Sequence, residues 1–243
     1  MDKFKLVCFD VDGTLVDSVS WFLLTEGLGC SSERHSEIFS RAKKQELSFL
    51  EGERMLTQMY RESGNATQEF IRGIFSRVRP KSEAKGAISY LKQNGYSVYL
   101  ISGAIDMYVE EIARKLEVDG FYANSTLEFD SKGVLERLNY RGNQGEVKAK
   151  QLSELVDKLG IGIHETVFVG DSENDIEVFK MTKHGIALNS PSEELKRVAW
   201  KNIETLKQLE GILYSKTGSN SLHDPQLFKV TPANRQEGGF LVE

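Results

Sequence analysis

Short apolar runs alternate with amphipathic segments along most of the chain. Runs rich in β-branched and aromatic residues predict buried strands, and they occupy residues 4–9, 97–101, 166–169 and 185–188. Helical periodicity follows or separates them, over about residues 83–94, 106–116, 146–159, 176–181 and 192–200. Because strands that alternate with helices build parallel sheets, the pattern predicts an α/β protein with a Rossmann-like parallel core.

Two local signals refine this prediction. Gly95 directly follows a helical segment, where a glycine commonly ends the helix. Residues 121–129 and 134–138 are strand-like and flank the turn Asp130-Ser131-Lys132-Gly133. This arrangement predicts a β-hairpin in an otherwise alternating chain.

A long helical segment interrupts the alternation near its start. Residues 18–79 show helical periodicity and contain no strand-like run. Pro80 marks its end, because the residue before a proline is biased away from the helical conformation. We expect a core domain from residues 1–17 and 80–213, an inserted helical domain over 18–79, and a C-terminal tail over 214–243. The tail is rich in Gly, Ser, Asn, Gln and Pro and lacks periodicity, which favours a mobile segment.

Composition narrows the possible partners and location. The net charge of −5 over 243 residues argues against non-specific binding to nucleic acid. Two cysteines, Cys8 and Cys30, cannot build a disulfide framework and indicate a reducing compartment. No apolar run approaches the ~18 residues of a membrane span, and the early Asp2 and Asp10 argue against a secretory leader. We expect a cytoplasmic protein without a membrane or nucleic-acid partner.

Polar residues follow the ends of the predicted strands, where ligands bind in open α/β sheets. They are Asp10 and Asp12 after the first strand, Ser102-Gly103 after the second, and Asp171, Asn174 and Asp175 after a later one, with Lys148 in the intervening helix. Each has an ordinary alternative. An Asp-x-Asp-Gly segment can be a calcium loop or a turn, a serine a helix N-cap, a lysine a solvated residue and Gly-Asp a bend.

Taken together, the four segments resemble the motifs of the haloacid dehalogenase (HAD) superfamily. They are Asp10-Val11-Asp12-Gly13-Thr14, Ser102, Lys148 and Gly170-Asp171-x-x-Asn174-Asp175, in that order. The resemblance covers about residues 5–195. It implies the HAD α/β core with a small helical cap domain inserted between the first and second motifs.

The resemblance also implies roles for these residues in phosphoryl transfer. Asp10 is expected to attack phosphorus and form an aspartyl-phosphate, and Asp12 to protonate the leaving oxygen and later to activate water. The carboxylates of Asp10 and Asp171 and the main-chain carbonyl of Asp12 are expected to hold Mg²⁺. The expected substrate is a small-molecule phosphate monoester.

The remaining motif residues are expected to bind phosphate or to orient their neighbours. Ser102 and Gly103, facing a helix N-terminus, would donate hydrogen bonds to the phosphate, and Lys148 and Asn174 would contact it. Asp175 and Thr14 would orient the groups around the metal.

The position and length of the insert are similar to the cap of the phosphoserine phosphatase branch, and Leu47-Ser48-Phe49 adds to this likeness. That branch binds the substrate's amino group with a glutamate and its carboxylate with a cap arginine. At those places this chain has Val19 and Leu56. Since an apolar side chain pairs with neither charge, we expect a substrate other than L-phosphoserine, unless Glu26 or Arg54 substitutes. Trp21, Phe22 and Phe49 could line a pocket, but a core position is favoured because aromatic residues at helical spacing are more often core residues.

Three functional classes follow from the motifs. They are a phosphatase, a phosphotransferase or phosphomutase of the same superfamily, and a catalytically silent phosphate-binding module. The presence of both Asp10 and Asp12 favours catalysis over the silent module and hydrolysis as its outcome. The sequence does not determine the oligomeric state.

Overall fold

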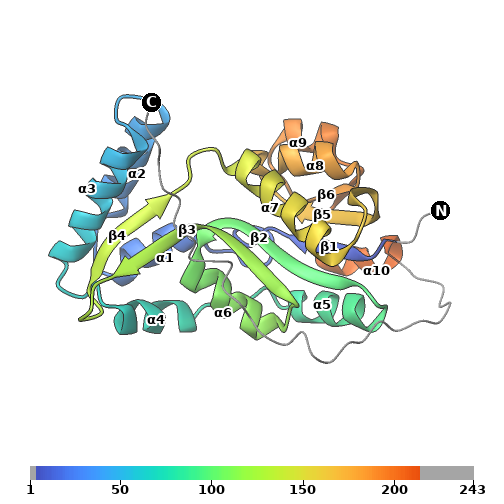
Figure 1. Cartoon of the computed structure of the whole chain (residues 1–243), viewed down its shortest axis with the longest axis horizontal. Coiled ribbons are helices and arrows are strands. Elements are labelled where there is room, and N and C mark those ends of the chain that lie inside the picture. Colours follow the sequence, from blue (N-terminus) through green and yellow to red (C-terminus); the bar gives the residue numbers. More distant parts are fainter. Residues whose placement is uncertain (1–3, 214–243) are drawn as a thin grey trace.

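A seven-stranded sheet with helices on both faces organises the computed structural model, which describes residues 4–213 (Figure 1). Its strand order is β4-β3-β2-β1-β5-β6-β7, and neighbouring strands run parallel except for the antiparallel pair β3–β4. The strands are β1 Leu6–Phe9, β2 Ser97–Ile105, β3 Gly120–Phe129, β4 Leu135–Tyr140, β5 Thr166–Gly170, β6 Gly185–Leu188 and β7 Lys201–Ile203. The predicted α/β class and the hairpin are confirmed.

Alternate side chains of the central strand β1 enter two separate hydrophobic clusters, because successive residues of a strand point to opposite faces. Val7 and Phe9 belong to the larger cluster, together with residues of helices α5 (Ala84–Gln93) and α6 (Asp106–Leu116). Leu6 and Cys8 belong to the smaller one, with α7 (Gln144–Leu159), α8 (Ile176–Thr182) and α9 (Glu193–Val198). The central strand is thus buried on both sides, as its continuous apolar run predicts.

Four helices occupy the long helical segment. They are α1 Ser20–Gly27, α2 Ser32–Lys43, α3 Phe49–Glu62 and α4 Gln68–Ser76. Their buried residues, among them Leu24, Tyr60 and Phe75, join the same hydrophobic cluster as β1 and α6. We propose that residues 18–79 form a cap domain on a core of residues 1–17 and 80–213.

The β3–β4 hairpin supports this helical segment, as Figure 1 shows on the side of α3 and α4. Arg61 donates from Nη1 to the carbonyl of Leu135 at 3.2 Å. The backbone amide of Gln68 donates to Gly133 O at 2.8 Å, and that of Leu135 donates to Ala66 O at 2.8 Å. Residues far apart in the sequence are therefore hydrogen-bonded at the cap, which periodicity does not predict.

Several element boundaries differ from the expectations. Strand β2 continues to Ile105 instead of ending at residue 101, because Gly103 and Ala104 form an irregularity in its pairing with β3 rather than a strand end. The helix expected over 192–200 ends at Val198, since Ala199 is extended and leads into the unpredicted strand β7. A short helix, α10 Leu209–Ile212, was also not predicted. Gly95 has φ +81° after α5, as expected of a residue that ends a helix.

None of the helices within residues 4–213 combines the length and apolar character needed to cross a bilayer. The tail expected over 214–243 lies outside the described residues.

Candidate active site

The loop after β1 is fixed by the neighbouring strand and by its own turn. The amide of Asp10 donates to Val169 O at 2.9 Å, and the amide of Val11 donates to Asp10 Oδ1 at 2.7 Å. Gly13 adopts φ +76°, and a Cβ there would lie 2.3 Å from Asp171 Oδ2. A glycine is needed here for two reasons: its backbone has a positive φ, and a side chain would prevent the close approach of this loop to Asp171.

Lys148 lies fully buried in α7 and connects three of the motif residues. Its Nζ donates to Asp175 Oδ1 and to Asn174 Oδ1, each at 2.6 Å, and lies 3.1 Å from Asp10 Oδ2. Burial lowers the pKa of Lys148, but the carboxylates of Asp10 and Asp175 outweigh this effect and raise it to about 12. The lysine is therefore a buried, permanently charged cation.

Asp171 follows the last residue of β5 and approaches Asp10. Its Oδ1 accepts a hydrogen bond from Thr14 Oγ1 at 3.0 Å, and its carbonyl accepts one from Ser190 Oγ at 2.5 Å. Burial, followed by the charge of Asp10, raises the pKa of Asp171 to about 6. Carboxylate oxygens of Asp10, Asp171 and Asp175 all lie within 4.8 Å of one another.

Asp175 is held differently from the other two aspartates. Its Oδ2 accepts from the amides of Asp171 at 3.1 Å and Ser172 at 3.3 Å, while Oδ1 accepts from Lys148. Burial raises its pKa, and the charge of Lys148 opposes this. Because both oxygens bind protein donors, this side chain orients Lys148 and the loop after β5.

Asp12 is oriented by Ser20, the first residue of α1. Its Oδ2 accepts from both the amide and the hydroxyl of Ser20, each at 3.1 Å. Its Oδ1 is buried and has no hydrogen-bond partner among the described residues. Burial, followed by the charge of Asp10, raises the pKa of Asp12 to about 7, so this carboxyl group can gain or lose a proton near neutral pH.

Ser102 and Gly103 lie at the irregular part of β2 rather than at the start of a helix. Ser102 is buried, and its Oγ accepts from the amide of Ala104 at 3.2 Å. The strand continues to Ile105 and α6 begins at Asp106, and the expectation that the pair faces a helix N-terminus stays a prediction. A Cβ on Gly103 would lie 2.7 Å from Gln144 Oε1, at the start of α7.

Three residues near these groups were not identified from the sequence: Ser20, Lys81 and Gln144. Lys81 Nζ donates to Gly13 O at 2.6 Å and lies 3.5 Å from Asp17 Oδ1. Gln144 Oε1 accepts from Asn124 Nδ2 at 2.7 Å. None belongs to a recognisable motif. Only Lys81 stands at a position that the sequence marked, directly after the predicted boundary at Arg79-Pro80.

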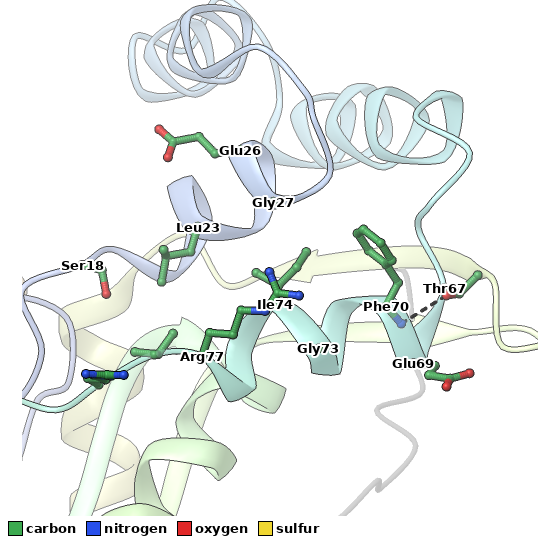
Figure 2. Close-up of a pocket in the computed structure, with 12 residues that line it drawn as sticks. Ser18, Leu23, Glu26, Gly27, Thr67, Glu69, Phe70, Gly73, Ile74 and Arg77 are labelled. Carbon is green, nitrogen blue, oxygen red and sulfur yellow. Dashed lines mark hydrogen bonds between the residues drawn. The ribbon is translucent and has the colours of Figure 1, made fainter.

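The residues considered for the substrate's charges lie at different places in the structure. Val19 is exposed, but Leu56 is buried in the main hydrophobic cluster. Glu26 lines a cavity of about 680 Å³ between α1 and α4, shown in Figure 2. Arg54 lines another, of about 960 Å³, between α3 and β4. The lining of neither cavity includes Asp10, Asp12 or Asp171.

Comparisons with known proteins agree with this geometry. Residues 4–181 match the family model described as haloacid dehalogenase-like hydrolase. The chain is 31% identical to a phosphoserine phosphatase of Methanocaldococcus jannaschii over 185 residues, which cover 73% of this chain and 82% of that protein. It is 30% identical to a phosphoserine phosphatase of Archaeoglobus fulgidus over 211 residues, which cover 86% of this chain and 60% of that protein. The match thus spans less than two thirds of the Archaeoglobus protein.

Solved structures give the same result. One described as a phospho-aspartyl intermediate analogue of phosphoserine phosphatase has a TM-score of 0.68 and 28% identity, covering 87% of this chain and all of that one. Another, of substrate-bound phosphoserine phosphatase, has a TM-score of 0.68 and 27% identity, covering 88% of this chain and all of that one. The chain belongs to the haloacid dehalogenase-like hydrolases, in their phosphoserine phosphatase-like branch.

Proposed function

We propose that the protein is a Mg²⁺-dependent phosphatase that hydrolyses a small phosphate monoester through an aspartyl-phosphate on Asp10. One observation carries the proposal: carboxylates from two distant strand ends, Asp10 and Asp171, lie within 4.8 Å of each other beside a buried lysine. The family of the chain supports the same reaction class.

The chemistry of the donor set fits a hard divalent cation. Three carboxylates meet a single buried lysine, and burial with the charge of Asp10 raises the pKa of Asp171 to about 6, so negative charge exceeds positive charge here. The carboxylates of Asp10 and Asp171 and the carbonyl of Asp12 would hold Mg²⁺, a cation that prefers oxygen ligands. When bound, the ion neutralises charge on the phosphoryl oxygens.

The side chains of Asp10 and Asp12 suit two different steps. Asp10 is fixed by Val11 and Lys148, so an oxygen of its carboxylate can attack phosphorus while the bond from phosphorus to the leaving oxygen breaks. Asp12 is held by Ser20 through Oδ2, and its unpartnered Oδ1 would donate a proton to that oxygen. In the second step Asp12 removes a proton from water, which attacks phosphorus and releases phosphate from Asp10.

The phosphate would be bound by the remaining motif residues. Ser102 Oγ and the Gly103 amide supply neutral donors, and Lys148 supplies positive charge. Asn174 accepts from Lys148 through Oδ1, which directs its Nδ2 away from the lysine and makes it a further donor. Thr14 orients Asp171. Such donors act most strongly on the charge that develops in the transition state.

O-phospho-L-serine is a candidate substrate because the relatives are phosphoserine phosphatases. Val19 and Leu56 argue for a different monoester, since neither pairs with an ammonium or carboxylate group. A cytoplasmic location is part of the proposal and is supported by the two free cysteines, Cys8 and Cys30.

A phosphate-release assay tests the proposal. The purified chain is incubated with sugar, nucleotide, amino-acid and glycolytic phosphates in Mg²⁺ and again in excess chelator. We expect release from at least one monoester, loss of release with chelator, and recovery when Mg²⁺ is restored. Equal release with chelator, or no release from any ester, would contradict the proposal. An added acceptor alcohol separates hydrolysis from phosphoryl transfer, since a transferase would form the new ester instead of free phosphate.

A further inference from the structure

Four aromatic side chains of the cap and the hairpin form one cluster, here called the aromatic wall: Trp21, Phe39, Phe49 and Tyr140. The ring of Tyr140 is central, with centroid distances of 6.1 Å to Trp21, 6.0 Å to Phe39 and 5.6 Å to Phe49. Phe39 and Phe49 are each 42% exposed. The sequence favoured a core position for Phe49 and Phe22, but both are exposed. Trp21 and Tyr140 are partly buried against the main hydrophobic cluster, so the two exposed rings continue an apolar surface of the kind that marks binding sites.

One connection joins the wall to the proposed acid of the reaction. Trp21 directly follows Ser20, whose amide and hydroxyl hold Asp12. Val19, on the other side of Ser20, is 40% exposed and apolar. The residues on both sides of the Asp12 contact are therefore apolar.

A second, independent connection joins the wall to the proposed phosphate donors. Tyr140 pairs with Ser125 in the hairpin, and Ser125 Oγ donates to Gly103 O at 2.9 Å. The ring of Phe49 lies against the loop before α7, since a Cβ on Gly142 would be 2.8 Å from it. The next residues of this loop lead to Gln144, which abuts Gly103. Short stretches of chain thus connect the wall to Asp12 on one side and to Gly103 on the other.

The charges around the wall favour an uncharged ligand. Glu53 Oε1 accepts from the amide of Tyr140 at 2.6 Å and is thereby engaged by the backbone. His35 stacks near Trp21 and Phe22 but is buried, which lowers its pKa and favours the neutral imidazole. Arg141, beside the wall, is exposed to solvent. A charged leaving group placed against the rings would lose hydration without a dedicated partner.

A quaternary ammonium group is the alternative ligand for aromatic rings. Such recognition needs ring faces arranged around the cation. Here Trp21 and Phe39 meet Tyr140 edge to face, with interplanar angles of 74° and 82°. Since these rings pack on one another instead of surrounding a space, the wall suits a flat apolar group better.

We propose that the aromatic wall binds the leaving group of the substrate, and that this group is uncharged and aromatic or similarly apolar. The inference rests on the proposed phosphatase function and specifies its substrate class. According to this inference, a monoester is preferred when its leaving group makes apolar contacts with the aromatic wall.

Four primary alkyl esters test the inference because their leaving oxygens are all alkoxides of similar kind: ethyl phosphate, 2-phenylethyl phosphate, O-phospho-L-serine and phosphocholine. We expect kcat/KM for 2-phenylethyl phosphate to exceed that for ethyl phosphate by at least about tenfold, as apolar contacts in a pocket allow. Phe49→Ala and Phe39→Ala, on different helices, should each lower this ratio. Phe70→Ala is the matched control, because Phe70 is 43% exposed but lies on α4 at the outer cavity of Figure 2, and the ratio should stay unchanged.

The outcomes separate the two proposals. If no ester releases phosphate, the phosphatase proposal fails and this inference fails with it. If ethyl and 2-phenylethyl phosphate react equally, or if phosphoserine or phosphocholine is preferred, the phosphatase proposal stands and the apolar leaving group is refuted. A ratio that falls equally in Phe70→Ala would also refute the wall, and thermal melting of each variant checks that it is folded.

Discussion

Lys148 shows how much a single residue contributes to the site. A lone lysine in a helix is usually solvated, yet this one is fully buried with contacts to Asp10, Asn174 and Asp175. Its charge offsets two carboxylates that would otherwise repel each other at close range. The residue therefore has a structural role that can be measured apart from activity.

The first prediction at this scale concerns Lys148→Met, which keeps the apolar volume and removes the charge. Breaking a buried ion pair leaves uncompensated charge, so the free energy of unfolding should fall by about 3–5 kcal/mol. Turnover of the folded variant should fall about a hundredfold or more. Urea denaturation and phosphate release measure the two effects. Lys150→Met, two residues away on the exposed side of α7, is the control and should change neither.

The second prediction concerns Asp10→Asn. The amide has nearly the same shape, and Lys148 keeps its contact with Asp175, so the variant should fold. Because an amide oxygen is a poor nucleophile, phosphate release should fall at least about a thousandfold. The measurement is release under saturating substrate with Mg²⁺. Substantial metal-dependent release by this variant would exclude Asp10 as the nucleophile.

At the scale of elements, the cap helices are connected by a buried polar network. Thr25 Oγ1 of α1 lies 2.7 Å from His35 Nδ1 of α2 and 2.9 Å from the Tyr60 hydroxyl of α3. His35 Nδ1 and the Tyr60 hydroxyl are 3.1 Å apart. Buried hydrogen bonds of this kind fix the relative positions of the elements that supply them. The network thereby fixes the three helices that carry most of the aromatic wall.

The third prediction follows from this network. Burial lowers the pKa of His35 in the folded protein below its ordinary value of 6.5. At pH values between the folded and the unfolded pKa, the unfolded chain therefore binds more protons than the folded one. The contribution of neutral His35 to the free energy of unfolding should therefore be complete above about pH 6.5 and should decrease as the pH falls below this value. Urea denaturation at pH 7.5 and 5.5 measures the change. The decrease should be smaller in His35→Gln than in the unchanged protein. An equal decrease in the two proteins would contradict the prediction.

At the scale of the whole molecule, the site joins strand ends that the sheet brings together. Strand β1 lies between β2 and β5, so Asp10 and Asp171 follow adjacent strands at the same end of the sheet, and Ser102 lies in the irregular part of the third of these strands, β2. A cation shared by Asp10 and Asp171 would connect two strand ends and bind only the folded chain. Binding to the folded state alone stabilises it by mass action.

The fourth prediction is that Mg²⁺ raises the melting temperature in the absence of substrate. Saturation at about a hundred times the dissociation constant contributes about 2.7 kcal/mol. Differential scanning fluorimetry with Mg²⁺ and with chelator measures the shift, independently of activity. The shift should disappear in Asp171→Asn and persist in Glu173→Gln, which changes an exposed carboxylate nearby. An undiminished shift in Asp171→Asn would place the ion elsewhere.

Much of this arrangement could be predicted because it depends on local pattern. The run from Leu6 to Phe9 is apolar without interruption, which is typical of a strand buried on both faces. Strand β7 could not be predicted in the same way. Lys201 and Asn202 are exposed and polar, and the segment is recognised as a strand only by its pairing with β6. The role of Ser20 was likewise hidden, since a serine at a helix start is expected as a cap whatever it contacts.

The sequence by itself determined the α/β alternation, the helical insert and the identity of the motif residues, because periodicity and turn chemistry act over a few neighbouring residues. Only the tertiary structure decided that Lys148 is buried among carboxylates, that Ser20 holds Asp12, and that rings from α1, α2 and α3 meet around Tyr140 of β4. Such contacts join residues far apart in the chain, 157 positions in the case of Thr14 and Asp171, and their distances depend on how the elements pack.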